Sequence, residues 1–557
     1  MFASDAYCRF ATFHLLFSNL ATLAYAQGHQ VRRAGHTVVR AGDELVIHGG
    51  LIFDSNVNLT YEHNTWFIPL DKNWNNRTLN AWAIHSEAPG LTYQALFVDK
   101  EREILYSFGG ALSPDGSIHD TQTNTFFEDY QPSIWALSLA NTKESRSWYK
   151  AVGMNAAMSW PSDIKQPTNG AYASDDQRGY YLGGCLSRWT TRGITNDMDT
   201  FTAPGLLKFD FAAKQLTNST DDGGFFMSQE TGLNHRNRKP WPGPLINAPF
   251  GPQGTLISFG GYRANDTDNT SGVGSRSIWI FDKASNVSYH QETTGDIPGS
   301  AEDGIAFFSA ADENNNTFEI FIWGRFDKTS KSDTIYVLSL PSFTWTKTSF
   351  QSYPRRKQMQ CQSAGNNQAI CIGGLLPESP IPSNTTDEWI QGVGVVDMTA
   401  LVLKDGYDAL APPYTAPEVV KRANKNKGHF PAIWNFPEVK DLFEDFNPGT
   451  TSRQKLSRKN TIIIAVVVPV VLTIMAVLSF CWFRKKEVFS EVLHFSSFQK
   501  TEFFGKVSPK RKSGTFGPLC DVKGNQMNNS GNGGFFSGSI KNLKVYTITK
   551  QYCRSTC

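Results

Sequence analysis

Histidine, cysteine and tyrosine side chains that could do chemistry are scattered singly along this sequence. It contains no H-E-x-x-H, G-x-S-x-G, Walker, Cys-x-x-Cys or EF-hand pattern. His36 and His48 are close enough in sequence to face each other across a hairpin. A metal ion would need further ligands there, and no pattern identifies them. We therefore expect hydrogen-bonded strand histidines, no metal, no cofactor and no enzyme activity.

Aromatic and charged side chains gather instead in two long segments, residues 111–132 and 185–204. Aromatic rings together with Arg are typical of binding anchors, and aromatic rings also stack on sugars. We expect these segments to bind an extracellular protein or a glycan. Long loops are also tolerated as insertions without a function, and that alternative stays open. The predicted binding residues are Phe126, Phe127, Glu128, Asp129, Tyr130, Arg188, Trp189 and Arg192.

A recurring motif indicates the scaffold that would position these segments. An apolar run ends in Gly-Gly five times, and each run is followed by a loop and another apolar strand. The order of a Trp, a Pro and the glycine pair also recurs along residues 28–405. A repeat of this kind indicates one structural unit used several times. The glycine pairs are Gly49-Gly50, Gly109-Gly110, Gly183-Gly184, Gly260-Gly261 and Gly373-Gly374.

Each repeat reads as strand, turn, strand ending in Gly-Gly, loop, strand, turn and strand. One four-stranded unit cannot bury both of its faces, whereas units stacked around an axis cover each other. Glycine suits positions where strands crowd or where φ is positive, and large rings would fill the wedge between units. The sequence thus predicts an all-β protein with a β-propeller over residues 27–405. A β-sandwich would leave the ordered recurrence unexplained.

This unit resembles the kelch repeat. Trp82, Trp148 and Trp345 match its late Trp, and "RAGHT" (33–37) resembles its opening strand. The fifth repeat departs from the pattern with Trp323-Gly324, and the fourth lacks the late Trp. The resemblance implies six four-stranded blades, or seven if a further blade lies within residues 185–259.

The resemblance implies binding more than catalysis. Some kelch propellers are copper radical oxidases such as galactose oxidase, whose chemistry needs two Tyr, two His and a Cys that partners one Tyr. Tyr180, Tyr181 and Cys185 lie close together in the sequence, but nothing else supports that match. We expect a binding module. The alternative is a membrane-tethered extracellular copper radical oxidase resembling galactose oxidase.

Two apolar segments predict targeting and anchoring. Residues 10–26 end in a small-x-small pattern, which predicts a signal peptide over 1–26. Residues 462–483 form an uncharged run of 22 residues followed by Arg484 and two lysines. At about 1.5 Å per residue this run spans the ~30 Å hydrocarbon core of a membrane. We therefore expect a single transmembrane helix at 462–483.

These segments predict a single-pass type I protein of the plasma membrane or cell surface. The propeller at 27–405 would be extracellular, 406–461 a juxtamembrane connector, and 484–557 a basic, disordered cytoplasmic tail. The net charge of +2 gives no general attraction to nucleic acid, and we expect no nucleic-acid partner.

An extracellular location permits disulfides and glycans. Cys361 and Cys371 flank "QSAGNNQAI", and a turn at 365–367 would place them opposite each other on adjacent strands. We predict a disulfide between them, which leaves Cys185 as a buried thiol. Eight Asn residues begin an N-x-S/T acceptor for glycosylation: Asn58, Asn76, Asn218, Asn265, Asn269, Asn286, Asn315 and Asn384.

Overall fold

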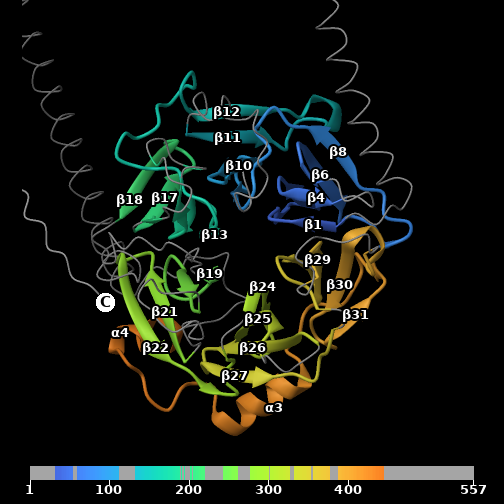
Figure 1. The fold of residues 1–557 in the computed structure, drawn as a ribbon. Helices are drawn as coiled ribbons and strands as arrows, with labels where there is room; N and C mark the ends of the chain where they lie inside the picture. Colours follow the sequence, from blue (N-terminus) through green and yellow to red (C-terminus); the bar gives the residue numbers. More distant parts are fainter. Residues whose placement is uncertain are drawn as a thin grey trace, which may run out of the picture. The chain divides into compact units, whose positions relative to one another are not determined.

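A computed structural model (Figure 1) describes most of residues 32–444. The described ranges are 32–53, 59–111, 132–187, 190, 194, 201–203, 205–219, 243–260, 276–299, 302–326, 332–352, 355–376 and 387–444. They belong to the first of two units into which the chain divides, Met1–Ser457. The predicted signal peptide, transmembrane helix and tail lie outside the described residues. Within those ranges, no helix has the length and apolar character needed to cross a membrane.

Six sheets form the six blades of a β-propeller, each built on four antiparallel strands, and the sheet of blade 5 has one further strand. In each blade the strands are hydrogen-bonded in chain order, with the first strand nearest the axis and the fourth at the rim (Figure 1). Blade 1 contains β2 (Thr37–Ala41), β3 (Glu44–His48), β6 (Asn64–Pro69) and β8 (Trp82–His85). Blade 2 contains β9 (Ala95–Asp99), β10 (Ile104–Phe108), β11 (Ser133–Ser138) and β12 (Trp148–Gly153). Blade 3 contains β13 (Ala171–Ser174), β14 (Arg178–Leu182), β17 (Leu206–Asp210) and β18 (Gln215–Ser219).

The second half of the ring repeats this order. Blade 4 contains β19 (Leu245–Ala248), β20 (Thr255–Ser258), β21 (Ser277–Asp282) and β22 (Val287–Glu292). Blade 5 contains β24 (Glu302–Asp312), β25 (Thr317–Arg325), β26 (Thr334–Leu340) and β27 (Thr344–Lys347), with β23 (Thr294–Gly295) parallel to β27. Blade 6 contains β28 (Gln360–Gly365), β29 (Gln368–Ile372), β30 (Val393–Asp397) and β31 (Val402–Lys404).

The prediction of six blades is confirmed. The described parts of 185–259 supply the last two strands of blade 3 and the first two of blade 4, so they contain no seventh blade. They also contain a two-stranded ribbon of β15 (Cys185–Leu186) and β16 (Phe201–Thr202). One detail of the repeat differs from the sequence analysis. Most of "RAGHT" precedes the first strand of blade 1. Its first two residues belong to β1 (Arg32–Ala34), which forms a separate small sheet with β4 (Leu51–Phe53) and β5 (Leu59–Tyr61).

Three of the glycine pairs connect neighbouring blades. The N–H of Gly110 donates to Pro167 O at 3.0 Å, which joins blade 2 to the segment that leads into blade 3. Gly109 has φ +73°, and a Cβ there would lie 2.6 Å from Pro167 O. Glycine is therefore required both by the left-handed backbone and by the close approach of the next blade. The second glycine makes the same kind of bond in Gly50 to Leu91 O and in Gly374 to Arg33 O.

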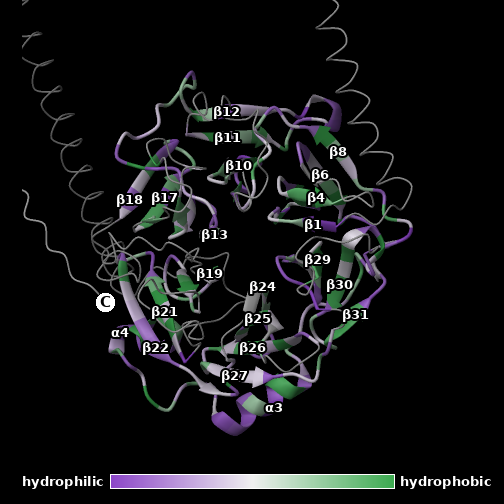
Figure 2. Ribbon diagram, in the orientation of Figure 1, coloured by the Kyte–Doolittle hydropathy of each residue, from purple (hydrophilic) through white to green (hydrophobic). Residues whose placement is uncertain are grey.

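The hydrophobic core is divided among the interfaces between blades. One cluster packs Val46 and Phe67 of blade 1 against Leu96 and Leu105 of blade 2. Similar clusters of described residues lie at the other interfaces, including the one between blades 6 and 1. Hydrophobic residues accordingly concentrate on the blade strands (Figure 2). Trp148 and Trp345 are buried in two of these clusters, as expected for rings that fill the wedge between blades.

The segment predicted as a connector is structured in its first part. Directly after blade 6, β32 (Gly406–Tyr407) pairs with β7 (Trp74–Asn75). In the chain, β7 lies between the third and fourth strands of blade 1. The chain then runs through α3 (Glu418–Lys427) and α4 (Pro437–Glu444), which lie against the rim (Figure 1). Val420 packs into the cluster between blades 5 and 6, whereas Val439, Leu442 and Phe443 join the one between blades 4 and 5. Residues 408–444 are called the strap below.

Candidate functional site

The predicted binding residues Phe126, Phe127, Glu128, Asp129, Tyr130, Arg188, Trp189 and Arg192 lie outside the described residues. The points from which their loops leave the blades are described. Ala111 and Cys185, each directly after a glycine pair, form backbone bridges with Thr92 and Thr168. These partners lie just before the first strands of blades 2 and 3, so both loops start from backbone that is hydrogen-bonded to the body of the propeller. We call this end of the propeller, where second strands finish, the glycine end.

Buried ion pairs occupy the glycine end between blades 6 and 1. Arg33 Nη2 lies 2.8 Å from Glu62 Oε2, and both side chains are buried. Glu62 also accepts hydrogen bonds from Trp66 Nε1 at 2.7 Å and from the Asn64 N–H at 2.9 Å. Because charges removed from water need several partners, this arrangement fixes the position of Glu62.

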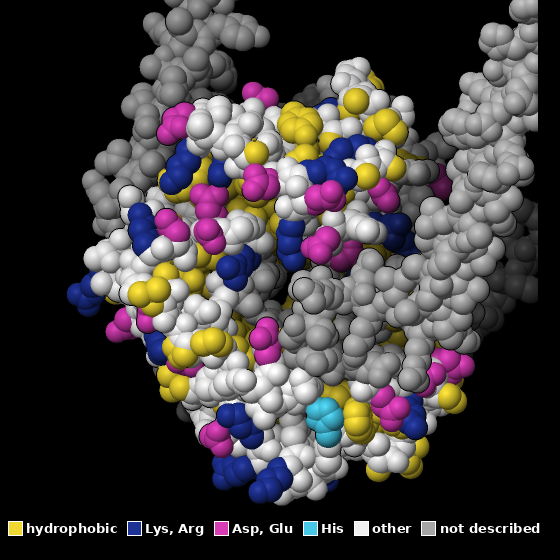
Figure 3. Space-filling model, turned by 180° about the vertical axis from the view of Figure 1, so that it is seen from behind, with side chains coloured by type: hydrophobic (Ala, Val, Ile, Leu, Met, Phe, Trp, Pro, Cys, Tyr) yellow, Lys and Arg dark blue, Asp and Glu magenta, His cyan; other side chains and the backbone are white. Residues whose placement is uncertain are grey.

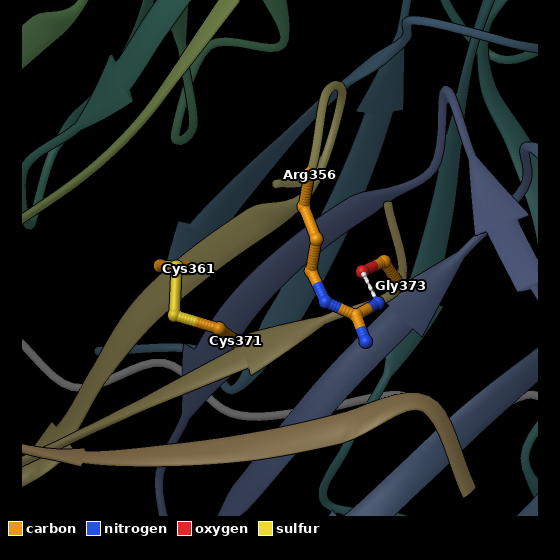
Figure 4. Close-up of a disulfide and its surroundings, with 4 residues drawn as sticks. All are labelled: Arg356, Cys361, Cys371 and Gly373. Carbon is orange, nitrogen blue, oxygen red and sulfur yellow. Dashed lines mark hydrogen bonds between the residues drawn. A yellow bond between two sulfur atoms is a disulfide. The ribbon is translucent and has the colours of Figure 1, made fainter. Parts of the chain in front are cut away.

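A second ion pair lies beside it in blade 6. Arg356 Nη1 donates to Asp387 Oδ2 at 3.1 Å and to Gly373 O at 3.1 Å (Figure 4). The guanidinium also lies 3.8 Å from the centroid of the Trp389 ring. The sequence analysis missed both ion pairs, because Arg and Lys are usually exposed and no pattern marks the few that are buried.

The two histidines singled out from the sequence are both buried beside blade 1. His48 Nδ1 lies 2.9 Å from Thr65 Oγ1, and its ring stacks on Trp148 at 4.5 Å. Burial, with a smaller effect of the Arg33 charge, lowers the pKa of His48 to about 3. The same two causes lower the pKa of His36 well below its usual value. Among the described residues, no group of three or more His, Cys, Asp or Glu could hold a metal ion.

The tyrosines near Cys185 are hydrogen-bonded within their own blade. Tyr181 Oη accepts the Gly170 N–H at 2.7 Å, and Tyr180 donates to Asp175 at 2.9 Å. Burial raises the pKa of both tyrosines. Both hydroxyl groups therefore take part in the packing of blade 3.

The predicted cysteine pair lies on the first two strands of blade 6. Cys361 and Cys371 are directly opposite each other on β28 and β29 and form a disulfide, with Cα atoms 4.0 Å apart (Figure 4). Cys185 is buried on β15.

Of the predicted glycosylation acceptors, Asn286 and Asn315 are exposed in turns between strands. Asn76 and Asn218 are half-buried. The other acceptors, Asn58, Asn265, Asn269 and Asn384, lie outside the described residues.

A groove between blades 1 and 2 lies at the end opposite the glycine end. Its walls come from turns between first and second strands and from loops between third and fourth strands, and its volume is about 1090 Å³. Trp82 forms part of the floor and stacks on Phe67, with centroids 4.1 Å apart and planes 10° apart. Lys143 Nζ lies 4.8 Å from the Trp82 centroid. The sequence analysis identified Trp82 only as a repeat residue, because the groove needs two blades to form.

Sequence reasoning also missed a feature of the glycine end. In five blades, the residue two positions before the first strand has a positive φ. In three of the five blades this residue is not glycine. The Tyr93 N–H donates to Gly35 O at 2.7 Å, and the Asn169 N–H donates to Tyr93 O at 3.1 Å. The varied residue types hide this repeat from a sequence pattern. The residues are Gly35, Tyr93, Asn169, Gly243 and Gln358.

The chain is similar to a curated protein and to solved structures. The chain is 24% identical over 408 residues to a kelch repeat-containing protein of Arthroderma benhamiae. The match covers 66% of this chain and 55% of the relative, so the chain spans about half the length of the curated relative that it matches. A solved structure described as "Structure of YjhT" has 13% identity, covers 67% of this chain and 97% of its own, and gives a TM-score of 0.40. No family model matches the chain.

Proposed function

Because the described part of the chain is a kelch-repeat β-propeller, we propose that the protein is a binding module for an extracellular protein or glycan. The proposal includes display on the cell surface, with the segment 462–483 as a single membrane anchor. The apolar character of that segment and the signal-like N-terminus support this placement.

One observation carries the binding role. The predicted binding segments 111–132 and 185–204 begin at Ala111 and Cys185, each directly after a glycine pair at the same end of the propeller. Each pair is held by neighbouring backbone, as in the Gly110 bond to Pro167. Loops that carry function are commonly positioned by a rigid scaffold in this way. The aromatic and Arg residues of these two loops supply the side chains that anchor partners.

The test uses intact cells that express the full chain with an epitope tag after residue 27. Antibody binding without permeabilisation measures display on the surface. Binding is then measured with labelled cell-surface glycoproteins and a panel of labelled glycans, both prepared from the organism whose cells express the chain. The double variant Phe127→Ala/Trp189→Ala should lose at least about tenfold in binding. Its thermal stability should match that of the wild type.

The matched control changes two exposed apolar residues outside the loops, Tyr149→Ala and Ile433→Ala, whose exposures are 46% and 77%. This control should bind like the wild type. Equal binding by the loop variant and the wild type would contradict the proposed role of the loops. A tag that antibody reaches only after permeabilisation would contradict the surface location.

A further inference from the structure

We propose that the groove between blades 1 and 2 binds a neutral oligosaccharide. A turn between first and second strands lies at the opposite end of an antiparallel blade from a loop between second and third strands. The groove is built from the former kind of turn and from the loops between third and fourth strands, so it is a separate site from the loops discussed above. The inference names a ligand class within the proposed binding function, but it does not depend on those loops.

An aromatic floor is the first reason. One face of Trp82 is fixed against Phe67, and the ring is half-buried. A nearby cation, Lys143, belongs to an exposed turn and can move away. The π-face of an indole carries partial negative charge, which attracts the C–H groups on the face of a sugar ring. A bound sugar would thus replace the ammonium group beside Trp82.

A fixed polar wall stands beside this floor. Arg146, from the loop between the third and fourth strands of blade 2, reaches Glu44 of blade 1, with Nη1 2.6 Å from Oε2. Its Nη2 donates to Leu139 O at 2.9 Å and its Nε to Asn141 O at 3.2 Å. The guanidinium lies 5.2 Å from the Trp82 centroid. Because these bonds hold Arg146 before any ligand arrives, little side-chain entropy is lost on binding.

The charge balance of the lining favours an uncharged ligand. Six carboxylates and five cations line the groove. An ionic ligand would therefore meet nearly as many like charges as opposite ones. The hydroxyl groups of a sugar donate and accept hydrogen bonds, so they can use both kinds of side chain. Several of the charged side chains that line the groove form no ion pair with another described residue, among them Arg40, Asp43, Lys72, Glu103 and Lys143.

The space is large enough for several sugar rings. Cavities of roughly 300–1,000 Å³ hold drug-sized ligands, and this groove has about 1090 Å³. Charges of both signs also lie close together over the upper part of the surface in Figure 3, so no broad field of one sign dominates that face. The groove thus offers an aromatic face, fixed donors and balanced charge to a neutral oligosaccharide.

The experiment titrates the full chain, kept in a detergent without a sugar headgroup, with neutral hexasaccharides. The probes are β-1,3-glucose, β-1,4-glucose, β-1,4-N-acetylglucosamine and α-1,6-mannose oligomers, followed by calorimetry. At least one probe should bind. Trp82→Leu keeps apolar contact with Phe67 but removes the flat face, and should weaken binding by about tenfold or more. Raising salt from about 50 to about 500 mM should change the Kd by less than about twofold.

Two further variants keep the test decisive. Trp135→Leu is the matched control, since Trp135 is also half-buried with a lysine, Lys150, at 5.4 Å from its centroid, but does not line the groove. It should bind like the wild type. Lys143→Ala, at an exposed position, should tighten binding about twofold or more because the ligand no longer displaces an ammonium group.

Failure of every probe to bind would overturn the proposal. So would an unchanged Kd in both Trp82→Leu and Lys143→Ala. Binding of a mixed Lys/Glu peptide that salt weakens and Trp82→Leu abolishes would assign the groove to a peptide and overturn the carbohydrate proposal. Unchanged oligosaccharide binding by Phe127→Ala/Trp189→Ala is expected, so this inference and the loop proposal succeed or fail separately.

Discussion

Besides the apolar clusters between blades, single glycines join neighbouring blades through backbone contacts. Gly109 shows the constraint, because its missing Cβ leaves room for Pro167 O of the next blade. The repeated glycine pair therefore reports a junction between blades as well as a turn at the end of a strand. Its recurrence could be read from the sequence because the same junction recurs around the ring.

Gly109→Ala should lower the free energy of unfolding by more than about 2 kcal/mol, since it combines a positive φ with a Cβ 2.6 Å from Pro167 O. Gly42→Ala is the matched control. Gly42 has φ +62° but nothing within 4 Å of an added Cβ, so the expected loss there is only about 1 kcal/mol. Urea unfolding of both variants measures the difference. Equal losses would show that the approach of the next blade costs nothing.

The burial of individual charged and aromatic side chains could not be predicted from the sequence. Arg33 and Arg356 are basic residues in polar segments, and their sequence surroundings resemble those of exposed arginines. Their burial depends on Glu62 and Asp387, which lie at least 29 residues away along the chain. The groove floor has the same origin, since Trp82 acquires its neighbours Lys143 and Arg146 only when blade 2 packs beside blade 1.

At the scale of elements, local patterns predicted the blades well and the strap poorly. The turn before Gln368 sets Cys361 opposite Cys371, which short-range spacing could indicate. The strap contains prolines, a basic run and a few aromatics, a composition that resembles a connector. Its apolar residues contact blades that are distant in sequence, so no local periodicity revealed them. Phe443, for example, stacks on Phe250 with centroids 4.1 Å apart.

The strap also covers a buried carboxyl group in blade 5. Glu319 Oε1 accepts a hydrogen bond from Ser339 at 3.0 Å, and Oε2 accepts one from Tyr414 of the strap at 3.3 Å. Burial, with a smaller effect of Asp312, raises the pKa of Glu319 to about 8. In the unfolded chain this pKa is near 4.5. Between these two values the folded state binds more protons, so the contribution of Glu319 to stability falls as pH rises.

Glu319→Gln should remove this pH dependence. Relative to the wild type, the variant should gain up to about 1.4 kcal/mol in unfolding free energy for each pH unit between pH 5 and pH 8. Comparing the two proteins at each pH cancels the opposite contribution of His36 and His48, which destabilise the fold as pH falls. Denaturant unfolding at pH 5, 6.5 and 8 tests this, and a constant difference across the series would contradict it.

At the scale of the whole molecule, the described strands close the ring without a blade that takes strands from both the first and the last part of the propeller. Blade 1 and blade 6 each take all four strands from one continuous stretch. The seam is held by the Gly374 bond to Arg33 O, by a hydrogen bond at 3.0 Å from Gln391 to Asn76 O, and by the pairing of β32 with β7. The repeat count predicted the ring, but it could not predict this closure in full, because closure also depends on β7, β32 and Gln391, which do not belong to the repeated motif.

A substitution of Tyr407 tests whether the ring opens first at this seam. It is buried in the cluster between blades 6 and 1 and stacks on Trp74 at 5.6 Å. Tyr407→Ala should cost about 3–5 kcal/mol, as is usual for loss of a buried aromatic ring. Hydrogen exchange should then speed up in β2 and β28, whose strands meet at the seam, and stay slow in β13. The local response follows because opening the seam leaves the other interfaces between blades intact.

Phe211→Ala is the matched control for Tyr407→Ala. Phe211 is buried between blades 2 and 3 and stacks on Tyr106 at 5.3 Å, so its loss should cost a similar free energy. Exchange in β2 and β28 should then remain slow, because the defect lies away from the seam. If both variants accelerate exchange equally in all six blades, the propeller opens as one cooperative unit. That result would show that the non-covalent seam is as strong as the continuous interfaces.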